Sequence, residues 1–378
     1  MCIRDRSMAA ARGGYVNVCT MPNLNPVPSD LESLKMQLEL IKDTSCINII
    51  PYGTITKKGN GKSELSDMEE LADFTIAYTD DGKGVQTQEL MFEAMEEARK
   101  LDKIIVAHCE DETLLKGGYI HDGKYAKAHN HKGICSESEW IQVKRDVELA
   151  QKLGTKYHVC HVSTKESVEI IRNAKKMGVD VTCETAPHYL ILTDEDLKEE
   201  GRFKMNPPLR DVSDRDELIR GIKDGTIDMI ATDHAPHSLE EKSKGLEKSP
   251  FGIVGLEIAF SLMYTHLVEK NIISFEKLLE LMCIKPMKRF EIDKYISIQR
   301  QLFENNFDFK KKYIPNRDKN YYIHDNMNAN FNIIDLNKEY IVDTDTFLSK
   351  GKATPFEGDK LRGKVVRTIL NGKTIWND

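Results

Sequence analysis

The sequence has no long hydrophobic run. None of its apolar stretches approaches the roughly 18 residues that a membrane-spanning helix requires. The first residues also lack the apolar core of a secretory signal peptide. We therefore expect no association with a membrane.

Charge of one sign is not in large excess either. Lys and Arg number 54 and Asp and Glu number 61, which gives a net charge of −7. There is no basic stripe, so the sequence does not favour binding to nucleic acid. An anionic substrate would have to be held by local cations or by a metal ion, because the overall field repels it.

Cysteine is sparse. The eight cysteines are spread over the chain and none forms a Cys-x-x-Cys motif. This pattern is typical of reduced thiols in a cytoplasmic protein. It disfavours a structural zinc site made of four cysteines.

What the sequence does contain is a regular alternation of short apolar runs and amphipathic segments. Hydrophobic residues make up 40% of the chain, which is enough for a large core. Near-continuous apolar runs predict parallel strands buried on both faces. The predicted strands are 15–21, 47–54, 74–79, 103–107, 156–160, 180–184 and 228–232.

Helical periodicity separates these strands. Leu31, Leu34, Leu38 and Ile41 follow the i, i+3, i+4 spacing of an amphipathic helix, and similar stripes recur between the later strands. Seven such units predict an α/β fold, a (β/α)8 TIM-type barrel that lacks its first strand. A doubly wound sheet is disfavoured, because Asp-Gly-Lys-Gly at 81–84 is too short and too acidic for a phosphate-binding loop.

The two ends of the chain depart from this alternation. Residues 1–7 carry no apolar period, and we interpret them as a foreign leader before a catalytic barrel at 8–291. Seven asparagines between 301 and 330 predict an insertion or a loosely ordered segment at 292–330. Further apolar runs and the turn signal Asn371-Gly372 predict a small β domain at 331–378.

Metal-ligand side chains recur where the predicted strands end. They are Asp80 and Asp81 after 74–79, His108 after 103–107, His161 after 156–160, His188 after 180–184, and Asp233, His234 and His237 after 228–232. Barrel enzymes carry their active sites at this end of the strands, and imidazole and carboxylate ligands suit Zn²⁺ or Mn²⁺. The pattern predicts a hydrolase in which a metal activates water and a further carboxylate moves the proton.

The motifs around these residues resemble the dihydroorotase family of the amidohydrolase superfamily, in the bacterial class whose two zinc ions share an aspartate. The resemblance covers about 8–291 and resumes near 329–378. The matching segments are Met-Pro-Asn at 21–23, Thr-Asp-Asp-Gly at 79–82, Ala-His-Cys-Glu at 107–110, Cys-His-Val-Ser-Thr at 160–164, Lys-Met-Asn-Pro-Pro-Leu-Arg at 204–210, 231–237 and Pro-Phe-Gly at 250–252.

The resemblance implies a role for each matching residue. Asp81 would bridge two zinc ions, and His108 and His161 would bind the second zinc. Asp233 would bind the first zinc and act as the general acid and base. The implied substrate-binding residues are Asn23, Asn206, His237, Phe251 and Gly252. The implied reaction is the reversible hydrolysis of (S)-dihydroorotate to N-carbamoyl-L-aspartate in pyrimidine biosynthesis.

One family motif has no counterpart in the chain. The family carries His-x-His-x-Arg after its first strand, which supplies two ligands of the first zinc and an arginine for the substrate carboxylate. Nothing before Asn23 matches it. His129-Asn130-His131 has part of the spacing but falls in a long loop, where exposure to solvent is the simpler interpretation. The resemblance therefore implies an amino-terminally truncated enzyme with an incomplete first zinc site and impaired activity.

Two alternatives remain open. Allantoinases and hydantoinases bridge their metals with a carboxylated lysine, whereas this sequence offers Asp80-Asp81 at that point. An inactive homologue that assembles with aspartate transcarbamoylase would also explain the missing motif. A homodimer is equally compatible with the sequence.

Overall fold

The computed structural model of the chain describes residues 3–314 and 329–378. Its helices are α1 (Ile3–Arg12), α2 (Leu31–Thr44), α3 (Met68–Leu71), α4 (Gln88–Lys100), α5 (Lys124–His129), α6 (Glu137–Leu153), α7 (Lys165–Lys176), α8 (Pro187–Ile191), α9 (Val212–Asp224), α10 (Leu239–Lys242), α11 (Gly245–Lys248), α12 (Ala259–Met263), α13 (Phe275–Leu279), α14 (Lys285–Arg289) and α15 (Ile292–Glu304). Its strands are β1 (Asn17–Thr20), β2 (Asn48–Pro51), β3 (Ile104–Ala107), β4 (Ile120–His121), β5 (Gly133–Ile134), β6 (Lys156–Val159), β7 (Val181–Thr185), β8 (Met229–Ile230), β9 (Phe331–Ile341), β10 (Lys360–Leu370) and β11 (Lys373–Asn377).

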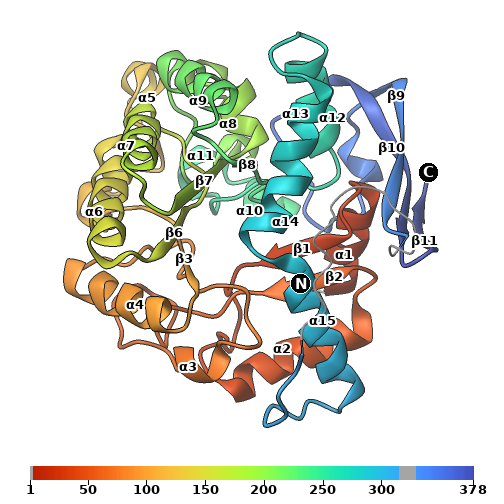
Figure 1. Cartoon of the computed structure of the whole chain (residues 1–378). Coiled ribbons are helices and arrows are strands. Elements are labelled where there is room, and N and C mark those ends of the chain that lie inside the picture. Colours follow the sequence, from red (N-terminus) through yellow and green to blue (C-terminus); the bar gives the residue numbers. More distant parts are fainter. Residues whose placement is uncertain (1–2, 315–328) are drawn as a thin grey trace.

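The parallel strands of the barrel follow one another in chain order (Figure 1). β1 pairs with β2, and β3, β6, β7 and β8 form a parallel sheet. Tyr78 joins the two sheets, because it bridges to Gly53 on one side and to Ile105 on the other. The prediction of a strand at 74–79 is therefore wrong. The backbone of this segment forms hydrogen bonds with the segments on both sides, but only Tyr78 forms β-bridges, and these are isolated.

Amphipathic helices cover the outside of the strands, as the predicted barrel requires. α4, α6, α7 and α9 lie side by side along the outer face of β3, β6 and β7 (Figure 1). Each buries one apolar stripe, such as Met91, Ala94, Met95 and Ala98 of α4. The resulting core is continuous from α2 to α13.

The carboxyl-terminal unit is an antiparallel sheet in the order β11–β10–β9, and α1 packs against β10 and β11 (Figure 1). Asn371 and Gly372 both have positive φ, 50° and 75°, as a two-residue hairpin turn requires. Residues 3–7 belong to α1, and Ser7 is buried. The predicted boundary between residues 7 and 8 therefore falls inside a helix.

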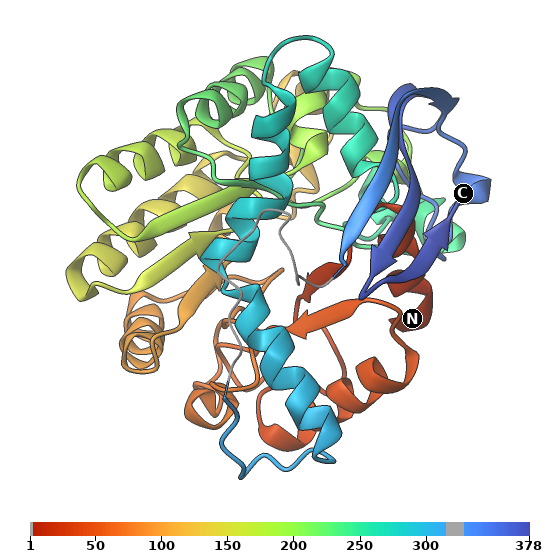
Figure 2. The ribbon, with the colours of Figure 1, turned by 45° about the vertical axis from the view of Figure 1, so that its right-hand side comes forward.

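Residues 292–304 form helix α15, so this part of the predicted insertion or loosely ordered segment is regular helix. Tyr295, Ile296 and Leu302 of this helix are buried, and Gln299 donates a hydrogen bond to the carbonyl of Ile49 at 2.9 Å. Figure 2 shows α14 and α15 descending past the barrel strands. The asparagine-rich composition that follows obscures this apolar stripe. Most of this asparagine-rich stretch falls at 315–328, outside the described residues.

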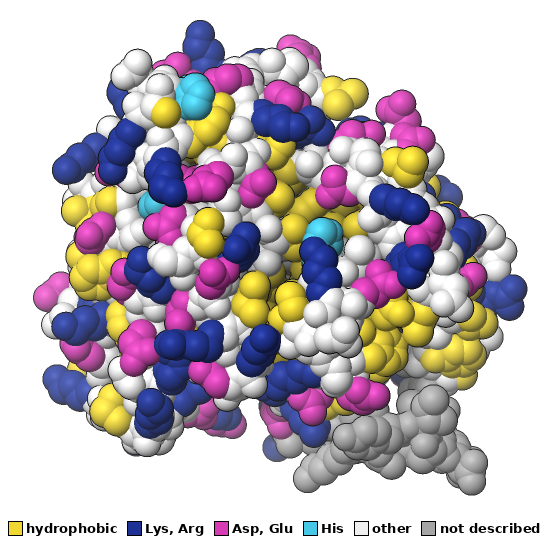
Figure 3. Space-filling model, turned by 90° about the horizontal axis from the view of Figure 1, so that it is seen from above, with side chains coloured by type: hydrophobic (Ala, Val, Ile, Leu, Met, Phe, Trp, Pro, Cys, Tyr) yellow, Lys and Arg dark blue, Asp and Glu magenta, His cyan; other side chains and the backbone are white. Residues whose placement is uncertain are grey.

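Three features that the sequence disfavours can be compared with the structure. Within residues 3–314 and 329–378, no helix has both the length and the apolar character that crossing a bilayer demands. The seven described cysteines are all free. On the face drawn in Figure 3, basic and acidic side chains are interspersed and form no continuous basic stripe.

Candidate active site

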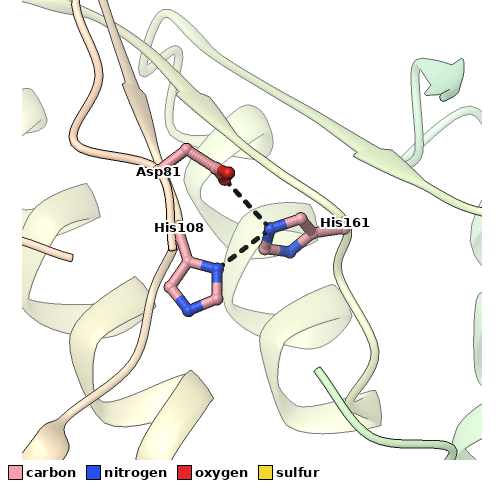
Figure 4. Close-up of side chains that lie close together, drawn as sticks. All are labelled: Asp81, His108 and His161. Atoms are coloured by element: carbon pink, nitrogen blue, oxygen red, sulfur yellow. Dashed lines mark hydrogen bonds and ion pairs between the residues drawn. The ribbon is translucent and has the colours of Figure 1, made fainter. Parts of the chain in front are cut away.

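Three ligand-type side chains meet at the carboxyl ends of the barrel strands. His108 follows β3 directly, His161 comes two residues after β6, and Asp81 follows the Tyr78 bridge. Neighbouring parallel strands end at the same rim, so these side chains are brought together although they are far apart in sequence. Figure 4 shows Asp81 and His108 both pointing at the ring of His161.

The donor atoms of this group converge closely. His108 Nδ1 lies 3.0 Å from His161 Nε2, which lies 3.4 Å from Asp81 Oδ1. One ligand atom from each of the three residues falls within 4.8 Å of the others. The two histidines are 3% and 4% exposed, so water does not screen the group.

The 3.4 Å separation matches that of two ligands on one metal ion, and the 3.0 Å separation is somewhat shorter. Two ligands that bind a tetrahedral zinc at about 2.0–2.2 Å lie about 3.3–3.6 Å apart. The other ring nitrogen of His108, Nε2, faces Glu110 Oε2 at 3.6 Å and makes no hydrogen bond in the described part of the chain. A buried carboxylate with two imidazoles is a donor set that suits Zn²⁺ and related metals.

Asp80 and Asp81 have different surroundings. The Asp80 carboxylate accepts backbone hydrogen bonds from Ile55, Thr56 and Gly61, at 2.9–3.1 Å. It therefore anchors the loop that follows β2. Asp81 faces the histidines instead, so the structure places only the second aspartate of the pair at the candidate metal position.

The electrostatics of the group favour a charged pair. Burial acts to raise the pKa of Asp81, but the hydrogen bond and charge of His161 outweigh it and lower that pKa below its ordinary value. Burial acts to lower the pKa of His161, but Asp81 and Asp233 raise it to about 9. The same negative field would attract a divalent cation.

Asp233 follows β8 and lies beside this group. Burial raises its pKa to about 6, and the charges of His161 and His108 oppose that rise. Its backbone φ is 45° and that of His161 is 32°, which are left-handed values that cost free energy in residues other than glycine. Strain of this kind at two candidate ligands is typical of a functional site.

Comparisons with known proteins identify the family. A sequence profile described as "Dihydro-orotase-like" matches residues 2–167. The dihydroorotase of Fusobacterium nucleatum is 50% identical over 98% of this chain and 81% of its own length. That of Bacillus subtilis is 45% identical over 100% of this chain and 82% of its own. The chain belongs to the dihydroorotase family.

Solved structures confirm the fold that the family membership predicts. The L-hydantoinase of Arthrobacter aurescens matches with a TM-score of 0.81 at 24% identity, over 99% of this chain and 80% of the other. The dihydropyrimidinase of Brevibacillus agri NCHU1002 matches with a TM-score of 0.77 at 19% identity, over 100% and 80%. At these identities the likeness supports the barrel architecture and not a substrate.

Some of the substrate-binding residues that the dihydroorotase resemblance implies lie near the group of Asp81, His108 and His161. Nδ2 of Asn23 lies 3.5 Å from Asp81 Oδ2. Asn206 donates to Glu110 Oε1 at 3.0 Å, and its own Oδ1 is buried without a partner among the described residues. His237 Nε2 lies 2.8 Å from the carbonyl of Phe251, so the His237 and Phe251-Gly252 segments are joined.

The histidine pair in the long loop is engaged elsewhere. His131 has Tyr119 at 2.7 Å from one ring nitrogen and Glu199 at 2.8 Å from the other. His129 lies 3.0 Å from the carbonyl of Tyr125 and is exposed. Neither belongs to the group around Asp81.

Glu139 of α6 is a site residue that sequence reasoning missed. Its buried carboxylate accepts hydrogen bonds from the backbone N–H groups of Ser163 and Thr164, at 3.1 and 3.0 Å. It thereby holds the loop that directly follows His161. Nothing in the sequence around Glu139 shows that its side chain reaches a loop 24 residues away.

Proposed function

We propose that this chain catalyses the reversible hydrolysis of the cyclic amide of (S)-dihydroorotate to N-carbamoyl-L-aspartate, a step of pyrimidine biosynthesis. The observation that carries the proposal is the convergence of Asp81, His108 and His161 at the barrel rim of a dihydroorotase family member. We expect the protein to act in the cytoplasm on a small-molecule substrate.

The proposed cofactor is a pair of zinc ions. His108 and His161 would hold one ion, Asp81 would lie between the two, and Asp233 would be a ligand of the other. When bound, zinc lowers the pKa of water to near neutrality and polarises the amide carbonyl. The convergence of one ligand atom each from Asp81, His108 and His161 within 4.8 Å supports this assignment.

Proton transfer falls to Asp233. In the hydrolytic direction its carboxylate accepts the proton of the attacking water and delivers it to the ring nitrogen as the amide C–N bond breaks. In the synthetic direction the same carboxylate removes the proton from the ureido nitrogen. Its place beside the charges of His161 and Asp81 supports this role.

The proposed substrate contacts come from four segments. Asn23, Asn206 and His237 would bind polar groups of the substrate, and the Phe251-Gly252 backbone would close on the ring. The partnerless Oδ1 of Asn206 supports its part, since a buried carbonyl without a donor is costly to maintain in the free protein.

A substrate comparison tests the proposal. The zinc-loaded chain is assayed with dihydroorotate, hydantoin and allantoin, both as given and preceded by a His-x-His-x-Arg strand of the family. We expect dihydroorotate to be the only substrate turned over, efficiently by the chain with the added strand and weakly or not at all by the chain as given. Asp81→Asn serves as the inactive control. Turnover of hydantoin or allantoin would favour a hydantoinase-type enzyme. If the chain with the added strand binds no metal and turns over no substrate, the result would favour an inactive partner of aspartate transcarbamoylase. Sedimentation of the purified chain tests separately for a homodimer.

A further inference from the structure

A buried ammonium group lies behind the proposed substrate loops. Lys242 ends the short helix α10 and is only 5% exposed. Its Nζ donates three hydrogen bonds, to the carbonyls of Lys204 at 3.0 Å, Pro250 at 2.8 Å and Gly252 at 2.7 Å. An ammonium group has three N–H donors, so all of them are used within the protein.

The three acceptors belong to segments that the proposed function assigns to substrate binding. Lys204 comes two residues before Asn206, and Pro250 and Gly252 enclose Phe251 in the sequence. The Gly252 N–H donates to the same Lys204 carbonyl at 3.1 Å. One side chain therefore ties the Asn206 segment to the Phe251-Gly252 segment.

The segment of His237, the third one proposed to bind substrate, contacts the Phe251-Gly252 segment as well. His237 precedes the helix that carries Lys242, and its ring contacts the Phe251 carbonyl as described above. Gly252 has φ of 123°, and a Cβ there would lie 2.6 Å from Ala235 Cβ. The Phe251-Gly252 turn thus packs tightly on the segment after Asp233 and has little freedom to move independently.

The arrangement is costly, which argues that it serves more than packing. No carboxylate pairs with the Lys242 ammonium in the described part of the chain. Burial, together with the nearby charge of Lys204, lowers the pKa of Lys242 to about 7. A buried charge that is neutralised only by backbone carbonyls loses more hydration than a methionine in its place would.

We propose that Lys242 is a positioning residue, which sets the mutual geometry of the Asn206 and Phe251-Gly252 segments for substrate binding through its three carbonyl hydrogen bonds. This inference rests on the proposed function for the role of those segments. Lys242 does not take part in the chemistry, because its donors are already used and the metal ligands lie on other segments.

The experiment compares Lys242→Met with a matched control, Lys103→Met. Lys103 is equally buried at 6% exposure and lies at the opposite end of β3 from His108, where it donates to the Thr75 carbonyl at 2.8 Å and the Tyr295 hydroxyl at 2.5 Å. Both variants remove a buried ammonium and keep an unbranched side chain of similar length. Loss of general stability is therefore common to both, and loss of loop geometry is specific to Lys242.

The first readout needs no substrate. Native-state hydrogen exchange of the Gly252 amide should accelerate at least about tenfold in Lys242→Met, relative to a core amide of β6, and stay unchanged in Lys103→Met. Unchanged exchange at Gly252 in Lys242→Met would overturn the inference. If Lys242→Met does not fold, Lys242→Arg is used: its planar fork cannot reproduce three diverging bonds, so the Gly252 amide should again exchange faster than in the parent.

The second readout separates positioning from a general structural role. Calorimetric titration of the zinc-loaded chain should show dihydroorotate binding weakened at least about tenfold in Lys242→Met, with zinc affinity within about threefold of the parent. Equal losses of zinc and substrate affinity would contradict a positioning role. A parent chain that binds zinc and not dihydroorotate would instead contradict the proposed function, while the exchange result would still decide whether Lys242 holds the loops.

Discussion

Glu139→Gln is the substitution that best tests how the metal site is held. The Oε1 atom of Glu139 accepts from the backbone N–H groups of Ser163 and Thr164, and from the hydroxyls of Thr164 and Ser167, at 2.8–3.1 Å. Its Oε2 accepts from the Ser163 hydroxyl and lies 3.8 Å from an Arg210 nitrogen. Glutamine keeps the shape and one carbonyl oxygen but loses the charge.

The magnitude follows from which interactions survive. The four bonds to Oε1 remain but become neutral, which weakens each of them. The Arg210 guanidinium, 4% exposed, loses its buried counter-charge and faces an amide N–H instead. Breaking one partner of a buried ion pair costs about 3–5 kcal/mol. We therefore expect Glu139→Gln to lower the free energy of unfolding by about 3 kcal/mol, since the 3.8 Å separation places this pair at the weak end.

The affinity of the chain for zinc should fall as well. Glu139 fixes the loop that leaves His161, and outer partners of metal ligands typically change metal affinity by about 10–100-fold. Urea unfolding of the metal-free chain gives the stability, and competition with a chelating dye gives the zinc affinity. Glu148→Gln is the control, because Glu148 is exposed on the same helix. A Glu139→Gln chain with both stability and zinc affinity equal to the Glu148→Gln chain would refute the reasoning.

Three further predictions concern other residues. Asp233→Asn is tested in a zinc-loaded chain that carries the family His-x-His-x-Arg strand at its start. The substitution should keep the fold and lower kcat at least about a hundredfold. A kcat within a few-fold of the parent in a steady-state assay would exclude the proposed proton transfer. His108→Ala should abolish tight zinc binding measured by dye competition, whereas the double substitution His129→Ala and His131→Ala should leave it intact; the opposite result would move the metal site to the long loop. Burial and the charge of Lys294 lower the pKa of Lys103 to about 7 from 10.5, so the unfolded chain binds more protons between those values and stability should rise with pH across this window. That rise should be smaller in Lys103→Met, and identical pH profiles from denaturant unfolding of the two chains at about pH 7 and about pH 9 would show that Lys103 does not titrate this way.

The features that the sequence determined by itself are those encoded within a few neighbouring residues. Continuous apolar runs predicted the parallel barrel strands, because a strand covered on both faces needs apolar residues at every position. Asn371-Gly372 predicted the hairpin, because only such residues readily adopt positive φ at both positions. The family motifs also placed Asp81, His108 and His161 after their strands, and parallel strands bring such ends to one rim.

Contacts between distant segments were decided only by the tertiary structure. The run at 74–79 forms a single bridge instead of a strand, and α15 appears next to an asparagine-rich stretch, because each depends on what packs against it. The same holds for Glu139 and Lys242. A buried charge is tolerated only where packing supplies its partners. These partners include Ser163, 24 residues from Glu139, and Lys204, 38 residues from Lys242, which are beyond the reach of any local periodicity.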